Sequence, residues 1–356
     1  MRSIGNIKSL NIKAIVIIIT LISSIHTAAQ EKAQTNFLGK LKGFTTKTVD
    51  FIGYVLNDID TLHVEESKYN LTVRPAYSYS YENYMLGTTG NAGQGIGIVP
   101  DSRNVLRLNF GWRWIIVGYS INLQKNRPLK EFNTSLYSTR FGLDLLYRKG
   151  SEGYHVNEMS GLYNGNEGAL DKQPLEDVLT VKQLGVGLHY AFNKRFSYSA
   201  AYGQTTIQRA SAGSLVVGAG YNWQEFTFDH ARIESATTTP LHNELLFDKT
   251  AYNDISISVG YAYNWVFARN MLAGISVEPA ISYKHAKQQY SEENRMQHSI
   301  AMDFTTRAAL LYNNNRYYAG ASYESHAYCY HKKPLYMANE FGVLEIYAGF
   351  YFWRRK

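Results

Sequence analysis

Hydrophobic and polar residues alternate along most of the chain after Tyr69. In residues 106–112, the even-numbered positions hold leucine, phenylalanine and tryptophan, while the odd-numbered positions hold arginine, asparagine and glycine. Side chains of a β-strand point alternately to its two faces, so this stretch is predicted to be a strand with one apolar and one polar face.

The alternation changes phase at Arg113-Trp114, because the odd-numbered positions of residues 115–123 are apolar. A two-residue hairpin turn explains the change and places Trp112 opposite Ile115 on the same face. Arg-Trp is not a favoured pair for such a turn. A β-bulge is the alternative, since one extra residue also reverses the phase.

The same period of two recurs in eight other segments, which are residues 69–79, 141–148, 183–190, 215–224, 255–265, 275–284, 300–310 and 344–352. Their polar positions hold mainly glycine, serine and asparagine, and the apolar sets often end in tyrosine or tryptophan. A soluble β-sandwich would carry charged residues on its outer face. A membrane barrel instead has an apolar outer band between aromatic girdles and a polar interior, and its closure gives every backbone group a partner. We therefore predict an all-β fold, a transmembrane antiparallel up-and-down β-barrel; a secreted soluble β-protein is the alternative.

We expect about twelve strands, with about ten or fourteen as alternatives, because bacterial single-chain barrels favour even numbers. The doubtful strand lies at residues 153–159. The expected short connections are residues 113–114, 193–195, 269–270 and 313–315, with a further short turn at 211–214. The expected long connections are residues 86–103, 160–181, 229–254, 285–297 and 327–339.

The first 29 residues have the pattern of a secretory signal peptide, with basic residues, an apolar run at 14–25 and small residues before Gln30. We expect cleavage after Ala29, and a retained N-terminal anchor is the alternative. Residues 30–67 are expected to be periplasmic, with an amphipathic helix over residues 36–57, where apolar residues recur at helical spacing. Residues 68–356 would form the barrel.

Composition fits export to a membrane. Hydrophobic residues make up 45% of the chain, charged residues only 18%, and 29 residues are tyrosine. The single cysteine, Cys329, excludes a disulfide within the chain. A net charge of +7 is compatible with nucleic-acid binding, but export argues against that partner. The expected partners are outer-membrane lipid, the barrel-assembly machinery and an unidentified extracellular ligand at the loops.

Several short motifs together resemble a known family. They include Phe110-Gly111-Trp112-Arg113-Trp114, Tyr190-Ala191-Phe192-Asn193 and Gly260-Tyr261-Ala262-Tyr263, after a segment that begins at Asp60. Their succession is similar to a family of outer-membrane barrels from the Bacteroidetes, domain of unknown function 4421. The resemblance covers nearly all of the chain from Asp60 and implies fold and location, but no mechanism. The terminal Arg354-Arg355-Lys356 departs from the aromatic C-terminus of many outer-membrane barrels.

Charged residues on the polar faces of the predicted strands are expected to point into the barrel. This candidate lining consists of Arg74, Arg107, Arg113, Arg140, Asp144, Arg148, Glu278, Asp303, Arg307 and Glu345. One interpretation is a structural network of arginine–carboxylate pairs that fills a narrow barrel. The other is a narrow channel for small anionic solutes, because arginine outnumbers the acids in this set.

Catalysis is a third interpretation, since some outer-membrane barrels modify lipid. It would need serine and histidine within hydrogen-bond reach and oriented by a third group, and the sequence contains no G-x-S-x-G motif. His326, Cys329 and His331 are too few for a convincing metal site. We expect a protein without catalytic activity, metal or cofactor, whose barrel serves a structural or interaction role.

Overall fold

The computed structural model describes residues 59–90, 93–101, 103–112, 115–123, 130–150, 153–162, 175–290 and 294–354. The chain divides into two units, Met1–Asp58 and Ile59–Lys356, and every described residue belongs to the second unit. The expected signal peptide, the expected helix at residues 36–57 and Arg113 all lie outside the described residues.

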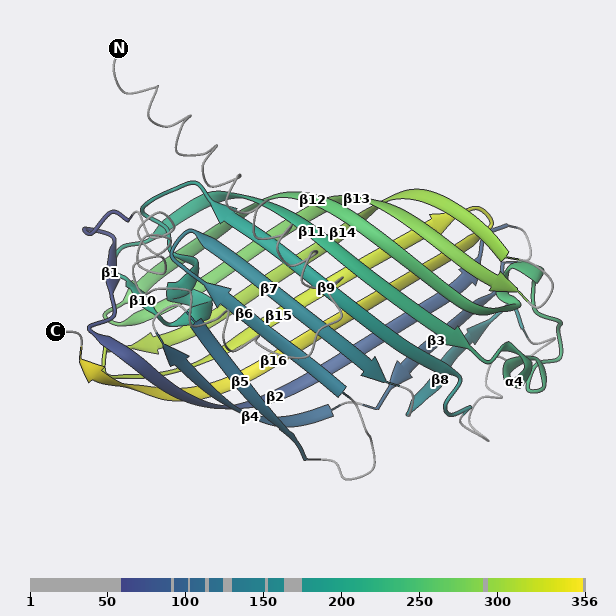
Figure 1. Cartoon of the computed structure of the whole chain (residues 1–356), viewed down its shortest axis with the longest axis horizontal. Coiled ribbons are helices and arrows are strands. Elements are labelled where there is room, and N and C mark those ends of the chain that lie inside the picture. The colour runs from purple at the N-terminus through teal and green to yellow at the C-terminus, as the bar shows by residue number, and fades with distance from the viewer. Residues whose placement is uncertain are drawn as a thin grey trace, which may run out of the picture. The chain divides into compact units, whose positions relative to one another are not determined.

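Twelve antiparallel strands form one continuous path around the second unit (Figure 1). In spatial order they are β5 (Ile115–Asn122), β4 (Arg103–Trp112), β2 (Tyr69–Thr88), β16 (Leu335–Arg354), β15 (Tyr317–Lys332), β14 (Asn294–Asn313), β13 (Met271–Tyr290), β12 (Phe247–Ala268), β11 (Ala212–Phe228), β9 (Leu179–Ala191), β7 (Phe141–Gly150) and β6 (Lys130–Tyr137). β5 and β6, at the two ends of the path, contact each other. The predicted all-β barrel of about twelve strands is confirmed.

The remaining elements lie off this path. β1 (Val64–Glu66) pairs with β10 (Thr206–Gln208), and β3 (Gly95–Pro100) pairs with β8 (Tyr154–Ser160) and with the end of β2. The short helices are the π-helix η2 (Ser199–Gly203), α4 (His230–Glu234) and the 3₁₀-helix η3 (Asn243–Leu245). Each helix in the described part of the chain is too short or too polar to cross a lipid bilayer.

The two faces of the wall strands differ as the alternation predicts. On β13, Ile281 is 65% exposed on the outside, whereas its neighbour Ser282 is fully buried on the inside. The outer positions of β12 and β14 also expose isoleucine, valine, methionine and aromatic residues. So continuous an apolar surface is unfavourable in water but favourable against the acyl chains of a bilayer.

Two predicted hairpins have the expected register. Trp112 is opposite Ile115, so the change of phase marks a turn and not a bulge. Asn270, in the turn between β12 and β13, adopts a left-handed φ of 65°, which asparagine tolerates better than most residues.

Several expected connections were wrong. Residues 193–195 form a turn but are not a short connection between two wall strands, because the chain then folds inward before β11 and buries Phe196 and Tyr198. Residues 211–214 are not a turn, because β11 begins at Ala212. The loops expected at residues 285–297 and 327–339 are mostly strand, since polar strand ends continue to pair beyond the apolar band. The doubtful strand at residues 153–159 is β8, which is not part of the wall.

The barrel has two distinct ends. The turn end, at the left of Figure 1, holds β1, β10 and the C-terminal end of β16, together with the connection between β9 and β11. The loop end, at the right, holds β3, β8 and α4.

Candidate functional site in the barrel interior

Arg307 on β14 is the centre of the ion network in the middle of the barrel, and its side chain is 1% exposed. Its guanidinium lies 2.9 Å from Glu278 on β13, 2.9 Å from Glu324 on β15 and 2.8 Å from Asp144 on β7. β7 is five strands away from β14 along the path, so the pair of Arg307 and Asp144 crosses the interior. Each donor edge of this fixed, planar cation therefore has a carboxylate partner.

His189 on β9 joins the same network from the opposite wall. Its Nδ1 lies 2.7 Å from Glu278, and its Nε2 lies 3.0 Å from Asp144. Tyr198, from the connection between β9 and β11, donates its hydroxyl to Glu278 at 2.8 Å. The inward-folded connection is thus hydrogen-bonded to the central network.

A second network lies toward the turn end, around Glu345 on β16. Glu345 pairs with Arg107 at 2.9 Å and with Arg74 at 3.4 Å, and accepts a hydrogen bond from Ser78. Arg74 also donates to the side chain of Gln204 at 2.9 Å, in the connection between β9 and β11.

A third network lies toward the loop end, around Glu82 on β2. Arg148 on β7 lies 2.9 Å from Glu82, and Arg103 on β4 lies 3.6 Å from it. Tyr84 and Tyr154 both donate their hydroxyl groups to the same carboxylate. The Arg148 side chain is 0% exposed, so this pair also joins non-neighbouring strands inside the barrel.

Lys284 on β13 forms a fourth group with two aspartates of the adjacent strands. Its ammonium lies 3.0 Å from Asp303 and 3.3 Å from Asp254. The rings of Tyr252 and Tyr328 lie within 5.6 Å of the same ammonium. A fully buried lysine is thus surrounded by two carboxylates and two aromatic faces.

Eight residues of the predicted lining take part in these four groups. They are Arg74, Arg107, Asp144, Arg148, Glu278, Asp303, Arg307 and Glu345. Arg140 does not, because it lies in the turn after β6 and donates to the backbone oxygens of Ala191 and Phe192. Its expected place on a strand was wrong, since β7 begins only at Phe141.

Sequence reasoning missed other members of these groups. They are Glu82, Arg103, His189, Asp254, Lys284 and Glu324. Arg103 and Asp254 lie at strand ends that had been assigned to loops, whereas His189 and Lys284 lie at polar positions of predicted strands and had not been included in the lining. A longer search along the alternation would have found Glu82 and Asp254.

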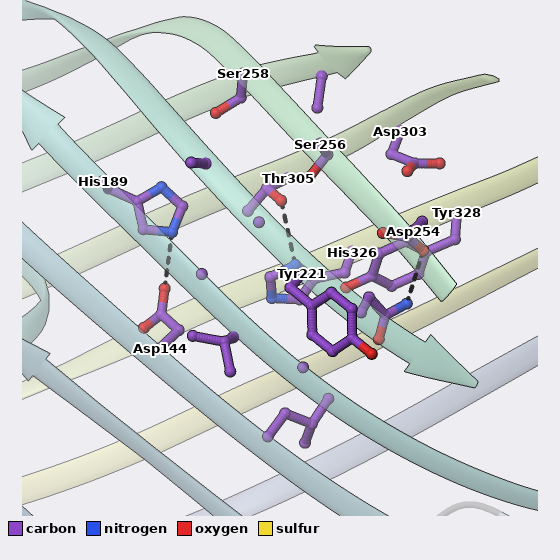
Figure 2. A pocket seen from close by; sticks show the side chains of 18 of the residues that line it. Asp144, His189, Tyr221, Asp254, Ser256, Ser258, Asp303, Thr305, His326 and Tyr328 are labelled. Carbon is purple, nitrogen blue, oxygen red and sulfur yellow. Dashed lines mark hydrogen bonds and ion pairs between the residues drawn. The ribbon is translucent and has the colours of Figure 1, made fainter. Parts of the chain in front are cut away.

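An internal cavity of about 100 Å³ lies between the central network and the Lys284 group. One wall carries small residues, among them Gly185, Gly187, Gly220, Ser256 and Ser258. Asp144 and His189 lie at one side, while Asp254, Asp303 and Tyr328 lie at another (Figure 2). A water molecule needs about 10–15 Å³ by this kind of measure, so the cavity has room for several.

One arrangement beside this cavity has the order of a nucleophile, a base and an acid. Thr305 Oγ1 lies 3.2 Å from His326 Nδ1, and His326 Nε2 lies 3.1 Å from Glu324 (Figure 2 shows the first contact). Glu324 is also held by Arg307, and the backbone N–H of each strand residue here belongs to the β-ladders. Stabilisation of an oxyanion requires hydrogen-bond donors that have no other partner, and the β-ladders already use the backbone donors at these strand residues. The arrangement is therefore better suited to holding the network together. Among the described residues, no group of three or more histidine, cysteine and acidic side chains has the geometry of a metal site.

The loop end of the interior is filled by a large apolar cluster. It combines residues of β3 and β8 with residues of α4, η3 and the wall strands. Ile96, Ile98, Leu162, Ile233 and Leu245 are all fully buried in it.

The turn end is filled by the connection between β9 and β11. Phe196 and Tyr198 pack against Tyr137 and Val216 there.

Outside the spanning strands, β1 pairs with β10 of the same connection. The backbone N–H of Leu62 donates to Asp60, and this bond holds the pKa of the Asp60 carboxyl below its usual value.

A family model described as Domain of unknown function (DUF4421) matches residues 58–352, which is most of the chain. The family resemblance predicted from the sequence is thereby confirmed. A comparison with curated proteins returned no match.

Solved structures of outer-membrane proteins are also similar. The outer membrane protease OmpT from Escherichia coli is 6% identical, with a TM-score of 0.39, over 80% of this chain and 97% of its own. Ail, the attachment invasion locus protein of Yersinia pestis, is 8% identical, with a TM-score of 0.22, over 77% and 97%. OprG from Pseudomonas aeruginosa is 13% identical, with a TM-score of 0.25, over 81% and 98%. Similarity at this level carries no conclusion about function.

Proposed function

This chain belongs to the family described as Domain of unknown function (DUF4421), and we propose that it is an outer-membrane β-barrel with a structural or interaction role and a filled interior. The loop end would face the outside of the cell and present α4 and the paired strands β3 and β8 to a partner. Outer-membrane lipid would surround the wall, and the barrel-assembly machinery would insert it.

The observation that carries this proposal is the set of ion pairs that cross the interior. Arg307 reaches Asp144 from β14 to β7, and Arg148 reaches Glu82 from β7 to β2. Breaking a buried pair leaves an uncompensated charge, so these contacts oppose any widening of the interior. The apolar clusters at both ends add to this barrier.

A narrow channel is the second candidate function, because the cavity of about 100 Å³ leaves polar space between the networks. The cavity is lined by Asp144, Asp254, Asp303 and Glu324. Arg307 and Lys284, beside it, are each held by carboxylates. This lining disfavours an anionic solute, since the guanidinium and ammonium groups are already occupied.

We propose no catalytic role. His189 and His326, the imidazoles beside the cavity, are both bound by carboxylates of the central network. The dense packing at both ends also argues against access for a substrate as large as a lipid.

Epitope accessibility on intact cells tests location and orientation together. A tag inserted after Thr238, in the exposed connection between β11 and β12, should be bound by antibody added outside the cells. The same tag inserted after Lys194, at the turn end, should be bound only after the outer membrane is permeabilised. Binding at Lys194 alone would reverse the orientation, and binding at neither site, with the protein recovered in the soluble fraction, would contradict the proposal.

The predicted signal peptide has its own test. Mass spectrometry of the purified protein should give Gln30 as the first residue. A first residue of Met1 would instead favour a retained anchor.

A further inference from the structure

The outer wall of β13 and β14 changes character toward the loop end. On β13, the exposed side chains Ile281 and Tyr283 are followed outward by His285 and Lys287. On β14, His298 occupies the corresponding position beyond the apolar Ile300. The sequence of apolar, aromatic and then cationic groups matches the passage from acyl chains to headgroups at a membrane surface.

His285 and His298 are directly opposite each other on the two strands. Their rings are stacked with centroids 4.7 Å apart, and the Tyr283 hydroxyl lies 2.7 Å from His298 Nδ1. Asn253 on β12 is the partner of His285 on its other side. Hydrogen-bonding side chains of three neighbouring strands therefore gather at one level of the outer wall.

The charge around this group is positive. Lys287 lies two residues from His285 on the same outer face, and Lys249 lies on the adjacent β12. Two carboxylates are nearby. Glu225 is already bound by Lys182 at 2.7 Å and by Lys249 at 2.8 Å, and Asp248, beside Lys249 on β12, lies 3.3 Å from His230. No outward position of β13 or β14, within their described residues, carries a carboxylate.

The wall differs at β16, two strands from β14 along the path. There Glu340 on β16 faces outward and accepts hydrogen bonds from Tyr81 and Ser325 at 2.7 and 3.0 Å. A carboxylate on β16 therefore borders the positive group of β13 and β14 on this side.

We propose that His285, Lys287 and His298, here called the basic patch, bind the phosphate group of an anionic membrane lipid. Lys287 would supply charge, and the imidazole, tyrosine and asparagine groups would supply hydrogen bonds to the phosphate oxygens. The acyl chains of the same lipid would pack on the apolar surface of Ile281 and Ile300 below. This inference rests on the proposed place of the barrel in an outer membrane, with its loop end at the lipid surface.

The test uses the full folded protein in detergent micelles, with ¹⁵N-labelled imidazoles observed by NMR. Dihexanoyl phosphatidic acid and dihexanoyl phosphatidylcholine have the same acyl chains but different headgroup charge. We expect phosphatidic acid to shift the His285 and His298 signals saturably, and phosphatidylcholine or inorganic phosphate to leave them nearly unchanged. Each lysine near a charged lipid surface contributes about fivefold in affinity, so Lys287→Gln should weaken binding by about that factor.

Lys149→Gln is the matched control, because Lys149 is also exposed on the outer wall but lies on β7, four strands from β13. It should bind phosphatidic acid as the unaltered protein does. The proposal is overturned if phosphatidylcholine shifts the signals equally, if inorganic phosphate alone saturates them, or if Lys287→Gln and Lys149→Gln behave alike.

Failure of this inference is distinguishable from failure of the proposed function. If the chain folds as a heat-modifiable barrel with the expected tag accessibility but does not bind phosphatidic acid, only the proposed lipid site is contradicted. If the protein is recovered in the soluble fraction and the tags are not accessible as expected, the proposed location in the outer membrane is itself contradicted.

Discussion

Arg307 joins three other strands to β14, because its guanidinium contacts acidic side chains of β7, β13 and β15. His189 adds a second link between Asp144 and Glu278. Such a shared cation is more than one ion pair, since its removal leaves three buried carboxylates with only imidazole and hydroxyl groups as partners.

Replacement of this cation should therefore be costly. Arg307→Met should lower the free energy of unfolding by about 3–5 kcal/mol, the range for breaking a buried ion pair. Arg74→Met is the control and should cost clearly less, because Glu345 keeps Arg107 as a partner. Urea unfolding of the refolded barrel, followed by tryptophan fluorescence, measures both. Equal losses of unfolding free energy for the two variants would show that the central network stabilises the barrel no more than the network around Glu345.

The two faces of a single strand offer a second test at this scale. Ile257 on β12 is 67% exposed on the outer wall, while Ser258 lines the cavity. Ile257→Arg should destabilise the inserted barrel by about 2–4 kcal/mol, as arginine does near the middle of a bilayer. Ser258→Arg should cost less, because Asp254 and Glu324 line the same cavity. Heat-modifiable migration on gels measures the folded fraction, and a larger loss for Ser258→Arg would reverse the assignment of faces.

Among the elements, the connection between β9 and β11 has the greatest influence on the interior. Tyr198 hydrogen-bonds to Glu278, and Gln204 accepts a hydrogen bond from Arg74, so this segment joins two of the ion networks. It also supplies the apolar side chains that fill the turn end.

Removal of this element should expose the cavity from the turn end. Residues 196–208 would be replaced by a short Gly-Ser linker, in a chain that carries Cys329→Ser and Ser258→Cys. A water-soluble maleimide should label Ser258→Cys slowly with the connection intact and much faster without it. Tyr198→Phe is the control, because it removes one hydrogen bond and keeps the packing. Similar labelling rates in all three chains, each verified as a folded barrel, would mean that the connection does not close the turn end.

The sequence predicts the wall of the barrel better than its interior, for a physical reason. Alternation reveals which face a strand residue occupies, so Trp112 opposite Ile115 and the inward place of Arg307 could be predicted. It does not reveal partners across the barrel, because the pair of Arg307 and Asp144 depends on curvature and register of the whole sheet. Phe196 and Tyr198 are residue types that are common in strands. They fold inward because the barrel interior has space for them, and that space cannot be predicted from the local sequence.

At the scale of the whole molecule, the barrel is a wall around a packed interior. Apolar clusters occupy both ends, and ion pairs between non-neighbouring strands occupy the middle. The remaining cavity of about 100 Å³ lies between these layers. Small barrels are generally filled by side chains, whereas open aqueous channels belong to wider ones.

The conductance of the purified, refolded protein in planar bilayers tests this account most directly. We predict no steady ion current from protein that migrates as a folded, heat-modifiable barrel. A steady current through the unaltered protein, changed in ion preference by Arg107→Gln or Arg307→Gln, would contradict the filled interior and favour a channel.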